Sequence, residues 1–217
     1  MNIEQARFNM IEQQIRPWEV LDQQVLDLLF VVKREDFVPP PYRNLAFADM
    51  EIPIGSGQVM LAPRVEARLL QELGIRKTDK ILEIGTGSGY MAALLAARAD
   101  HVISIESRPA LADIARQNLE RAGVANVTVE VGNGASGWSP RGPYDVIVVS
   151  GSLPTLPDAL LKQLRVGGRL AAIIGTAPVM EAQLVTCSGD GVFNTVNLFE
   201  TVVPALDGGE AKPAFSF

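Results

Sequence analysis

The residues with the clearest chemical signature form a glycine-rich block at residues 83–90, with the sequence Glu-Ile-Gly-Thr-Gly-Ser-Gly-Tyr. The block follows a short apolar run and precedes a helical pattern. Its backbone N–H groups and the positive end of the helix can therefore approach a bound ligand closely. The dinucleotide fingerprint G-x-G-x-x-G requires glycine at the position where Tyr90 stands. The spacing therefore disfavours a nicotinamide-dependent oxidoreductase.

Two polar positions follow the next two predicted strands. Glu106 stands 21 residues after Gly85, and its carboxylate can accept hydrogen bonds from both ribose hydroxyls of an adenosine cofactor. Asn133, in a Gly-Asn-Gly turn, offers an amide that can face an adenine edge. Ligands of open α/β sheets bind where the carboxyl ends of adjacent parallel strands meet. A helix cap or a tight turn would explain each residue alone, but their joint placement predicts an adenosine-cofactor site.

Few side chains could carry nucleophilic or metal chemistry. The 217 residues include one His and one Cys, which leaves at most two such zinc ligands and one imidazole for a nucleophile triad. His101 opens an apolar run and is interpreted as a strand-edge residue, and Cys187 as a small packing residue. We therefore expect no metal site and a chemistry that does not depend on the protein's own reactive side chains.

Composition limits the partners and the compartment. The net charge is −6 and no Lys/Arg block stands out, which predicts no nucleic-acid partner. No apolar run reaches the roughly 20 residues that span a bilayer, and the N-terminus lacks a signal-peptide pattern. A single Cys excludes an intrachain disulfide and fits a reducing compartment. We expect a soluble, cytoplasmic protein without a membrane partner, as a monomer or a weak oligomer.

The elements that would position these residues begin near residue 80, where short β-branched runs alternate with helical patterns. The runs predict strands at residues 81–84, 101–105, 127–131, 146–149 and 170–174. Helices are predicted around residues 94–95 and over residues 109–123 and 157–168, the last of these including Leu164. Strands that are apolar on both faces and alternate with helices imply a parallel sheet covered on both sides.

The flanking segments have different patterns. Before residue 76, the apolar spacing predicts helices at residues 2–15, 20–32 and 63–74, with a break at Arg16-Pro17 and a loop with short elements over residues 42–62. After residue 176, alternating segments at 181–186 and 195–203 predict an antiparallel hairpin. We expect one structural domain made of a helical N-terminal lobe (1–75), a cofactor-binding α/β core (76–176) and C-terminal strands that complete the sheet (177–217).

The core resembles the class I S-adenosylmethionine-dependent methyltransferases, and nearly the whole chain resembles the protein-L-isoaspartate (D-aspartate) O-methyltransferase family. The segments that carry this resemblance are residues 32–39, 52–58, 83–90, 132–134 with 137–138, 144–148, 163–170 and 203–204. The resemblance implies a doubly wound, mostly parallel sheet of seven strands, the Rossmann-like methyltransferase fold. It also implies S-adenosyl-L-methionine as cofactor and carboxyl methylation of isoaspartyl residues in damaged proteins or peptides, a repair reaction.

The resemblance also assigns the cofactor site. The residues implied to bind the cofactor come from the glycine block and from the ends of the next two strands: Glu83, Gly85, Thr86, Gly87, Ser88, Gly89, Tyr90, Glu106, Ser107, Asn133 and Gly134. The family usually has Asp where Asn133 stands. The Asn side-chain oxygen can still accept a hydrogen bond from the adenine amino group.

This chain departs more strongly from the family in the active-site segment. The family has Thr-Ile-Ser, with the Ser in the active site, where this chain has Val59, Met60 and Leu61. A lost polar contact typically costs ~1–3 kcal/mol. We therefore expect slow methylation of isoaspartyl substrates, and residues 59–61 are named the apolar segment below.

Three functions are compatible with these residues. The first is methylation of isoaspartyl residues, which needs no general base because a carboxylate with a pKa of about 4 is already ionised at neutral pH. The second is methylation of another acceptor, such as an apolar small molecule, since the apolar segment makes that region hydrophobic. The third is a cofactor-binding protein that lacks catalysis and acts through a partner.

Overall fold

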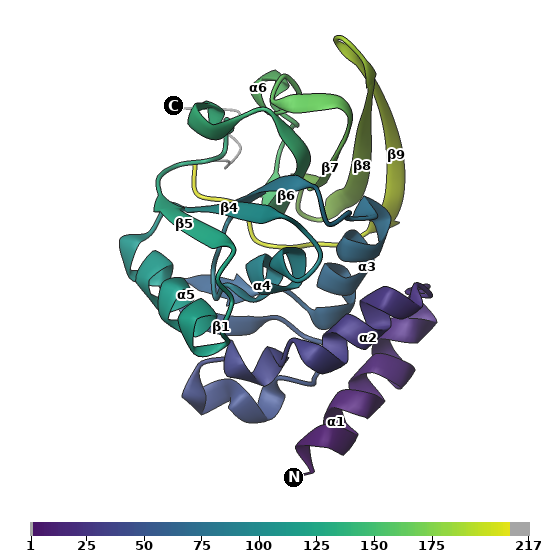
Figure 1. Ribbon diagram of the computed structural model, residues 1–217. Coiled ribbons are helices and arrows are strands. Elements are labelled where there is room, and N and C mark those ends of the chain that lie inside the picture. The colour runs from purple at the N-terminus through teal and green to yellow at the C-terminus, as the bar shows by residue number, and fades with distance from the viewer. Residues whose placement is uncertain (1, 209–217) are drawn as a thin grey trace, which may run out of the picture.

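The computed structural model describes residues 2–208 and contains a sheet of seven strands in the order β5-β4-β3-β6-β7-β8-β9 (Figure 1). The strands are β3 (Lys80–Ile84), β4 (His101–Glu106), β5 (Val127–Val131), β6 (Tyr144–Leu153), β7 (Leu164–Thr176), β8 (Val179–Gly189) and β9 (Val192–Glu200). The first five strands of the order are parallel, and β8 and β9 are antiparallel. The expected doubly wound, mostly parallel fold with a C-terminal hairpin is confirmed.

Both faces of the sheet are buried. Ile81 and Val102 belong to a hydrophobic cluster shared with α3 (Pro63–Leu73), α4 (Tyr90–Ala96) and α5 (Pro109–Arg121). Their neighbours Leu82 and Ile103 belong to a second cluster that includes Leu160 of α6 (Asp158–Leu161). Successive side chains on a strand point to opposite faces, so each of these strands contributes side chains to both clusters. This explains why the sequence of each strand is apolar without alternation.

The part of the N-terminal lobe that precedes α3 packs on the α3–α4–α5 face. It contains α1 (Ile3–Met10), a π-helical turn (Ile11–Ile15), three 3-10 turns (Arg16–Trp18, Arg34–Asp36 and Pro40–Leu45), α2 (Gln23–Val31) and a small hairpin of β1 (Ile52–Gly55) and β2 (Gln58–Met60). Met10 and Ile15 join the same cluster as Ile81, so the lobe and the sheet share one core. The predicted boundaries at residues 75 and 176 stay a prediction, and residues 209–217 of the third segment lie outside the described residues.

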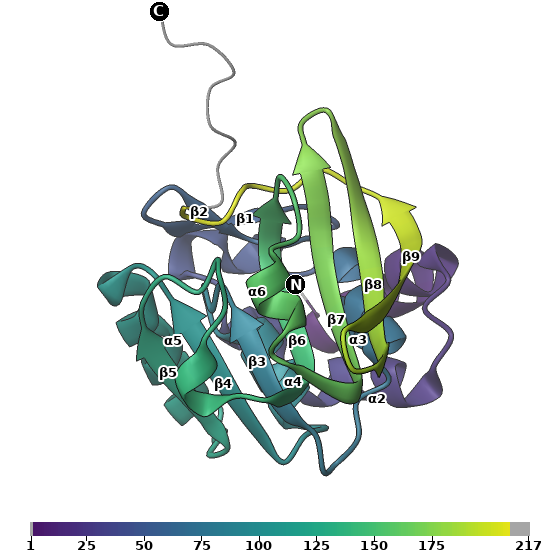
Figure 2. The same cartoon turned by 90° about the horizontal axis from the view of Figure 1, so that it is seen from above.

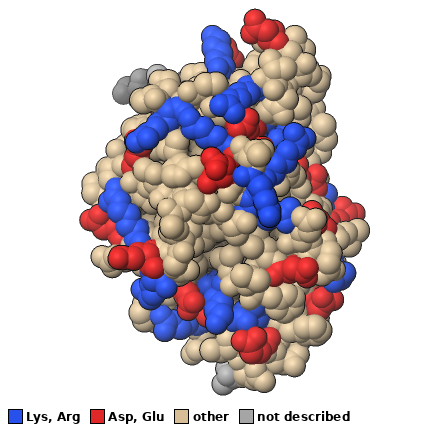
Figure 3. All heavy atoms as spheres, viewed as in Figure 1, with Lys and Arg blue, Asp and Glu red and all other residues tan. Residues whose placement is uncertain are grey.

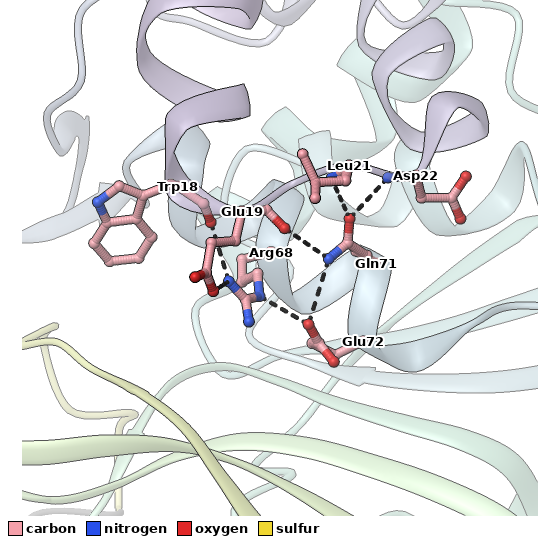
Figure 4. Close-up of polar contacts among 7 residues, drawn as sticks. All are labelled: Trp18, Glu19, Leu21, Asp22, Arg68, Gln71 and Glu72. Carbon is pink, nitrogen blue, oxygen red and sulfur yellow. Dashed lines mark hydrogen bonds and ion pairs between the residues drawn. The ribbon is translucent and has the colours of Figure 1, made fainter.

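Side chains of α3 fix the turn that joins α1 to α2 (Figure 4). Gln71 accepts hydrogen bonds from the backbone N–H groups of Leu21 and Asp22, at 2.7 and 3.0 Å. Arg68 donates to the carbonyl oxygen of Trp18 at 3.1 Å, and the Trp18 ring lies 5.1 Å from the ring of Phe199 in β9. Side chains of α3 therefore hold the backbone of this turn, and a ring contact joins the turn to the last strand of the sheet.

Several helix and strand ends differ from the sequence prediction. The helix predicted over residues 157–168 is only Asp158–Leu161, because Leu164 already pairs with Tyr144 as the first residue of β7. The helical backbone continues through Pro17 in a 3-10 turn, since proline fits the first turn of a helix. The second helix starts later than residue 20, where the Asp22 carboxylate caps it by accepting from the backbone N–H of Gln24 at 2.8 Å.

A further difference concerns the chain after β9, which was expected to stay in the hairpin to residue 203. It leaves β8 after Thr201, whose N–H still donates to the Met180 oxygen at 3.2 Å. It then pairs with β6, where Ser152 donates its backbone N–H to the oxygen of Pro204 and accepts from the N–H of Leu206. Figure 2 shows this segment, in yellow, crossing the strand ends from β9 toward β2. Residues 203–208 are named the C-terminal segment below.

Surface charges of both signs are interspersed on the face drawn in Figure 3. No helix in residues 2–208 is long and apolar enough to cross a membrane. Within the same residues, no group of three or more His, Cys, Asp or Glu side chains could bind a metal ion.

Candidate functional site

A cavity lies beside the carboxyl ends of β3, β4 and β5. Three groups of residues line it. The first comes from the strand ends, the turns that follow them and the start of α5: Ile84, Gly85, Gly87, Ile105, Glu106, Ser107, Leu111, Gly132, Asn133, Gly134, Ala135 and Ser150. The second is Ile54, Gln58 and Val59 of the β1–β2 hairpin, and the third is Leu206 and Asp207 of the C-terminal segment.

The glycine turn, residues 85–89, forms one wall of the cavity. Gly85, Gly87 and Gly89 all have positive φ angles, of 92°, 52° and 86°, a conformation that favours glycine. A Cβ atom on Gly85 would stand 2.9 Å from Leu206 Cδ2 and 3.3 Å from the Ser150 oxygen. Gly85 and Gly87 line the cavity, whereas Gly89 faces Ala115 and Leu119 of α5. The turn therefore presents bare backbone to whatever occupies the cavity.

Glu106 ends β4 and its carboxylate is fixed by backbone donors. One oxygen accepts from the N–H of Gly87 at 2.9 Å, and the other accepts from the N–H of Arg108 at 3.1 Å. The side chain is 5% exposed and lines the cavity. The Ser107 hydroxyl also lies 3.5 Å from the oxygen that accepts from Arg108, whereas the oxygen that accepts from Gly87 keeps a second lone pair with which Glu106 can accept a hydrogen bond from a ligand. Ser107 lines the cavity beside it.

The turn after β5 forms the opposite wall. The Asn133 side-chain oxygen, to which the sequence assigns a bond with the adenine amino group, accepts from the N–H of Ala135 at 2.9 Å. One lone pair of this oxygen is left for a ligand. Gly134 packs closely on the sheet, because a Cβ atom there would stand 2.9 Å from Ile84 Cγ2. The structure thus brings Asn133 and Gly134 to the same cavity as Glu106.

Glu83 lies behind the glycine turn rather than at the cavity surface. It is fully buried, and its carboxylate accepts hydrogen bonds from the hydroxyls of Ser104 at 2.5 Å and Ser150 at 3.2 Å. Burial raises the pKa of Glu83 to about 8, although the two hydroxyls oppose the shift. Ser150 lines the cavity and so connects this carboxylate to it.

Three more residues of the predicted set support the turn from behind. The Thr86 hydroxyl lies 2.6 Å from that of Ser104, and the Ser88 hydroxyl accepts from the N–H of Tyr90 at 3.4 Å. Tyr90 is buried, and its ring lies 5.5 Å from that of Phe37 in the N-terminal lobe. None of these three residues lines the cavity.

The apolar segment is divided between the cavity and the core. Val59 lines the cavity, whereas Met60 and Leu61 are buried in the cluster on the α3–α4–α5 face. The Leu61 carbonyl oxygen accepts a hydrogen bond from Arg34 at 2.5 Å. The predicted active-site role of the three positions stays a prediction, and Val59 is the member that faces the cavity.

Asp207 and Leu206 are site residues that the sequence did not predict. Asp207 accepts two hydrogen bonds from the Arg108 guanidinium, both at 2.7 Å, and one from the Ser107 hydroxyl at 2.6 Å. These donors lower the pKa of Asp207 to about 2. Gln58 of β2 also donates to this carboxylate, at 3.4 Å. The only sequence signal nearby was the Val203-Pro204 match, which ends before these residues.

A sheet of this strand order, with antiparallel last strands and a glycine turn beside a carboxylate at the strand ends, is the Rossmann-like fold of class I methyltransferases. The sequence model of the family described as Protein-L-isoaspartate(D-aspartate) O-methyltransferase matches residues 5–208. The chain belongs to this family.

Relatives and solved structures agree with this assignment. A protein from Methanoculleus marisnigri named Protein-L-isoaspartate O-methyltransferase is 46% identical over 169 residues, which are 78% of this chain and 77% of the relative. A protein of the same name from Koribacter versatilis is 41% identical over 209 residues, which are 96% of this chain and 94% of the relative.

Two solved structures share the fold. A structure titled protein-L-isoaspartate O-methyltransferase superposes with a TM-score of 0.77 at 25% identity, over 92% of this chain and 65% of that longer one. A putative protein-L-isoaspartate O-methyltransferase from Plasmodium falciparum, in complex with S-adenosyl-L-homocysteine, superposes with a TM-score of 0.81 at 19% identity. The latter match covers 95% of this chain and 98% of that chain.

Proposed function

We propose that the protein is an S-adenosyl-L-methionine-dependent O-methyltransferase that methylates the carboxylate of isoaspartyl residues in damaged proteins or peptides. The observation that carries the proposal is the cavity in which bare glycine backbone, the fixed carboxylate of Glu106 and the Asn133 amide face one another. Relatives that are 46% and 41% identical and carry the name of this activity support it.

The residues fit an adenosyl cofactor. Gly85 and Gly87 keep side chains out of the cavity, as close approach of a ligand to backbone requires. Glu106 presents acceptors for ribose hydroxyls, and Asn133 and Gly134 present an amide and a flat backbone for a purine edge. Ser107 lines the cavity beside Glu106. The remaining predicted residues, such as Thr86, Ser88 and Glu83, would act by holding the turn in shape.

The bound cofactor supplies an electrophilic methyl group on a sulfonium. The protein's own task is then to hold an acceptor carboxylate in line with that group, a positioning effect that can supply roughly 7–11 kcal/mol of a barrier. The acceptor is ionised at neutral pH, so no base is needed from a chain with one His and one Cys. Ile54, Gln58 and Val59 form the wall that an acceptor entering beside the hairpin would meet.

A second candidate is methylation of an apolar small-molecule acceptor. The observation that favours it is that Val59 and Ile54 give this wall of the cavity an apolar surface where the family pattern has a threonine. Loss of catalysis, with action through a protein partner, is the third reading. The cytoplasmic location and the monomeric or weakly oligomeric state stay predictions.

The test is a methyl-transfer assay with labelled cofactor on an isoaspartyl peptide and on the matched aspartyl peptide. We expect label in the isoaspartyl peptide alone, as a base-labile ester. The Glu106→Ala variant serves as control, because activity of the site proposed here must fall with cofactor affinity. No transfer to the isoaspartyl peptide by a protein that binds the cofactor would refute the proposed acceptor. Absence of cofactor binding would refute the whole assignment.

A further inference from the structure

Arg34 is a buried cation behind the cavity, in the 3-10 turn Arg34–Asp36 of the N-terminal lobe. Its side chain is 1% exposed. The guanidinium donates through Nε to the Ala46 oxygen at 3.1 Å, through Nη2 to the Leu61 oxygen at 2.5 Å, and through Nη1 to the Glu66 carboxylate. All three nitrogens are therefore engaged by groups from three different segments.

The guanidinium also lies over an aromatic ring of the core. Its central carbon stands 5.1 Å from the ring centre of Tyr90, within the range of a cation–π contact. Tyr90 is the first residue of α4 and directly follows the glycine turn. Leu61, on the other side, ends the apolar segment whose first residue lines the cavity. One side chain thus joins the acceptor wall to the element that begins at the glycine turn.

The arrangement depends on arginine rather than on positive charge alone. A guanidinium is planar and presents its N–H groups in a rigid fork, so it can bond three carbonyl or carboxylate partners while its face lies on a ring. An ammonium group could pair with Glu66 but could not reach both walls in this geometry. Glu66 is itself buried, which makes the pair an internal one.

We propose that Arg34 is a positioning residue for methyl transfer, fixing the apolar segment relative to the glycine turn and hence the acceptor relative to the methyl donor. The proposal rests on the proposed function. In-line displacement is sensitive to such placement, since a 1 Å displacement can lower the rate roughly 100-fold. Arg34 does not line the cavity and acts through its contacts with Leu61 and Tyr90.

Arg7 provides a matched control. It is 2% exposed, pairs with the buried Glu35 and lies 5.8 Å from the Phe47 ring centre, so its environment resembles that of Arg34. Its hydrogen bonds run to Glu4 and Glu35 within the N-terminal lobe, not to the apolar segment. A purely structural effect of losing a buried guanidinium should therefore appear in both variants.

The test compares Arg34→Lys with Arg7→Lys by thermal unfolding, cofactor affinity, and kcat and KM on the isoaspartyl peptide. We expect similar destabilisation in the two variants and unchanged cofactor affinity. Only Arg34→Lys should lose kcat, by roughly 10- to 100-fold. An unchanged kcat in Arg34→Lys, or an equal fall in both variants, would overturn the proposal.

A second variant separates the proposed positioning effect of Arg34 from a loss of folding stability. Replacing a buried ion pair by apolar residues of similar size is often neutral for stability. Arg34→Met with Glu66→Leu should therefore fold but lose kcat as Arg34→Lys does, and a folded double variant with full kcat would overturn the proposal.

Hydrogen exchange gives a readout that needs no acceptor. Amides of residues 58–62 should exchange faster in the Arg34 variants and not in Arg7→Lys, with unchanged exchange counting against the proposal. Wild-type protein that is inactive on the peptide would refute the proposed function, and the exchange comparison would then decide whether Arg34 fixes the apolar segment.

Discussion

The two sides of the cavity are built in different ways. The cofactor side is formed by the ends of the parallel strands β3, β4 and β5, on one side of the sheet, and its carboxylate accepts hydrogen bonds from backbone N–H groups. The acceptor side is formed by the two-stranded β1–β2 hairpin and by the C-terminal segment, which the chain adds from outside the core of the sheet. The cofactor side departs from the family pattern only in the change from Asp to Asn at Asn133, whereas the acceptor side loses both hydroxyls of the family's Thr-Ile-Ser. A site can change its acceptor wall without disturbing the sheet that holds the cofactor.

The largest effect should come from placing a side chain on the cofactor side. Gly85→Ala puts a Cβ atom 2.9 Å from Leu206 Cδ2 at a positive φ angle, inside the cavity wall. We expect cofactor affinity to fall by roughly 100-fold, about 2.7 kcal/mol, in a calorimetric titration. Gly167→Ala is the control, because its φ of +81° is similarly strained but nothing lies within 4 Å of the new atom. Equal affinity losses in both variants would show that strain alone is responsible.

Removing the carboxylate of the cofactor side should have the next largest effect. Glu106→Ala is expected to weaken cofactor binding by about 1–3 kcal/mol, because hydrogen bonds to a charged group are lost. Glu106→Gln keeps one oxygen acceptor and should lose less. Calorimetry on the three proteins measures this order. Identical affinities would show that Glu106 serves only to hold Gly87 and Arg108 in place.

On the acceptor side, two single changes in the apolar segment should have opposite consequences, a gain in activity for one and a loss of stability for the other. Val59→Thr puts a hydroxyl into the cavity wall and should raise kcat/KM on an isoaspartyl peptide by up to about tenfold, equivalent to one hydrogen bond of ~1.4 kcal/mol. Leu61→Ser removes a buried leucine and should instead destabilise the protein by about 2–4 kcal/mol without a gain in rate.

The sequence pattern alone predicts that restoring both hydroxyls, Val59→Thr with Leu61→Ser, raises activity. The structure assigns that gain to Val59, because Leu61 lies in the core. Steady-state kinetics and chemical denaturation of the two single variants and the double variant test this. A rate gain from Leu61→Ser alone would contradict the difference between the two positions.

The smallest effect should come from the C-terminal segment. Arg108 and Ser107 lower the pKa of Asp207 to about 2 from an ordinary 3.8. A carboxyl group with a lowered folded-state pKa stabilises the fold above its unfolded pKa, and this contribution is lost as the pH falls from 3.8 toward 2. Asp207→Asn should cost at most about 1 kcal/mol at pH 7, because the ion pair is partly exposed.

Denaturation curves of wild type and Asp207→Asn check this expectation. The difference in unfolding free energy should be constant from pH 7 to pH 5 and smaller at pH 3. A difference that grows on acidification would show that the carboxylate is not the group responsible.

The strands and the cofactor side could be predicted because their signals are local. The β-branched run at Val127–Val131 forms a strand with those bounds, and Pro63 and Gly74 mark the ends of α3 as predicted. The glycine spacing and Glu106 led to the cavity because strand order brings their ends together. Glycines that line the cavity alternate in this turn with residues that point away from it, which the sequence pattern did not predict. Thr86 and Ser88 were therefore expected at the cavity, and they lie behind it.

The acceptor side could not be predicted because it depends on contacts between distant segments. Asp207 reaches the cavity only because the chain leaves β8 and pairs with Ser152 of β6. No local pattern near residue 207 indicates that return. Likewise, nothing in the sequence of the apolar segment shows that Val59 faces the cavity while Leu61 is fixed in the core by Arg34.

The ring contact between Trp18 and Phe199 has a consequence for how the protein folds during synthesis. The N-terminal lobe is made first, but one of its contacts is with the last strand of the sheet. Contacts between distant parts of a chain slow folding, because the intervening chain must be ordered before they form. We therefore expect the lobe to complete its docking only after β9 has left the ribosome, with the Trp18 ring lacking its contact with Phe199 until then.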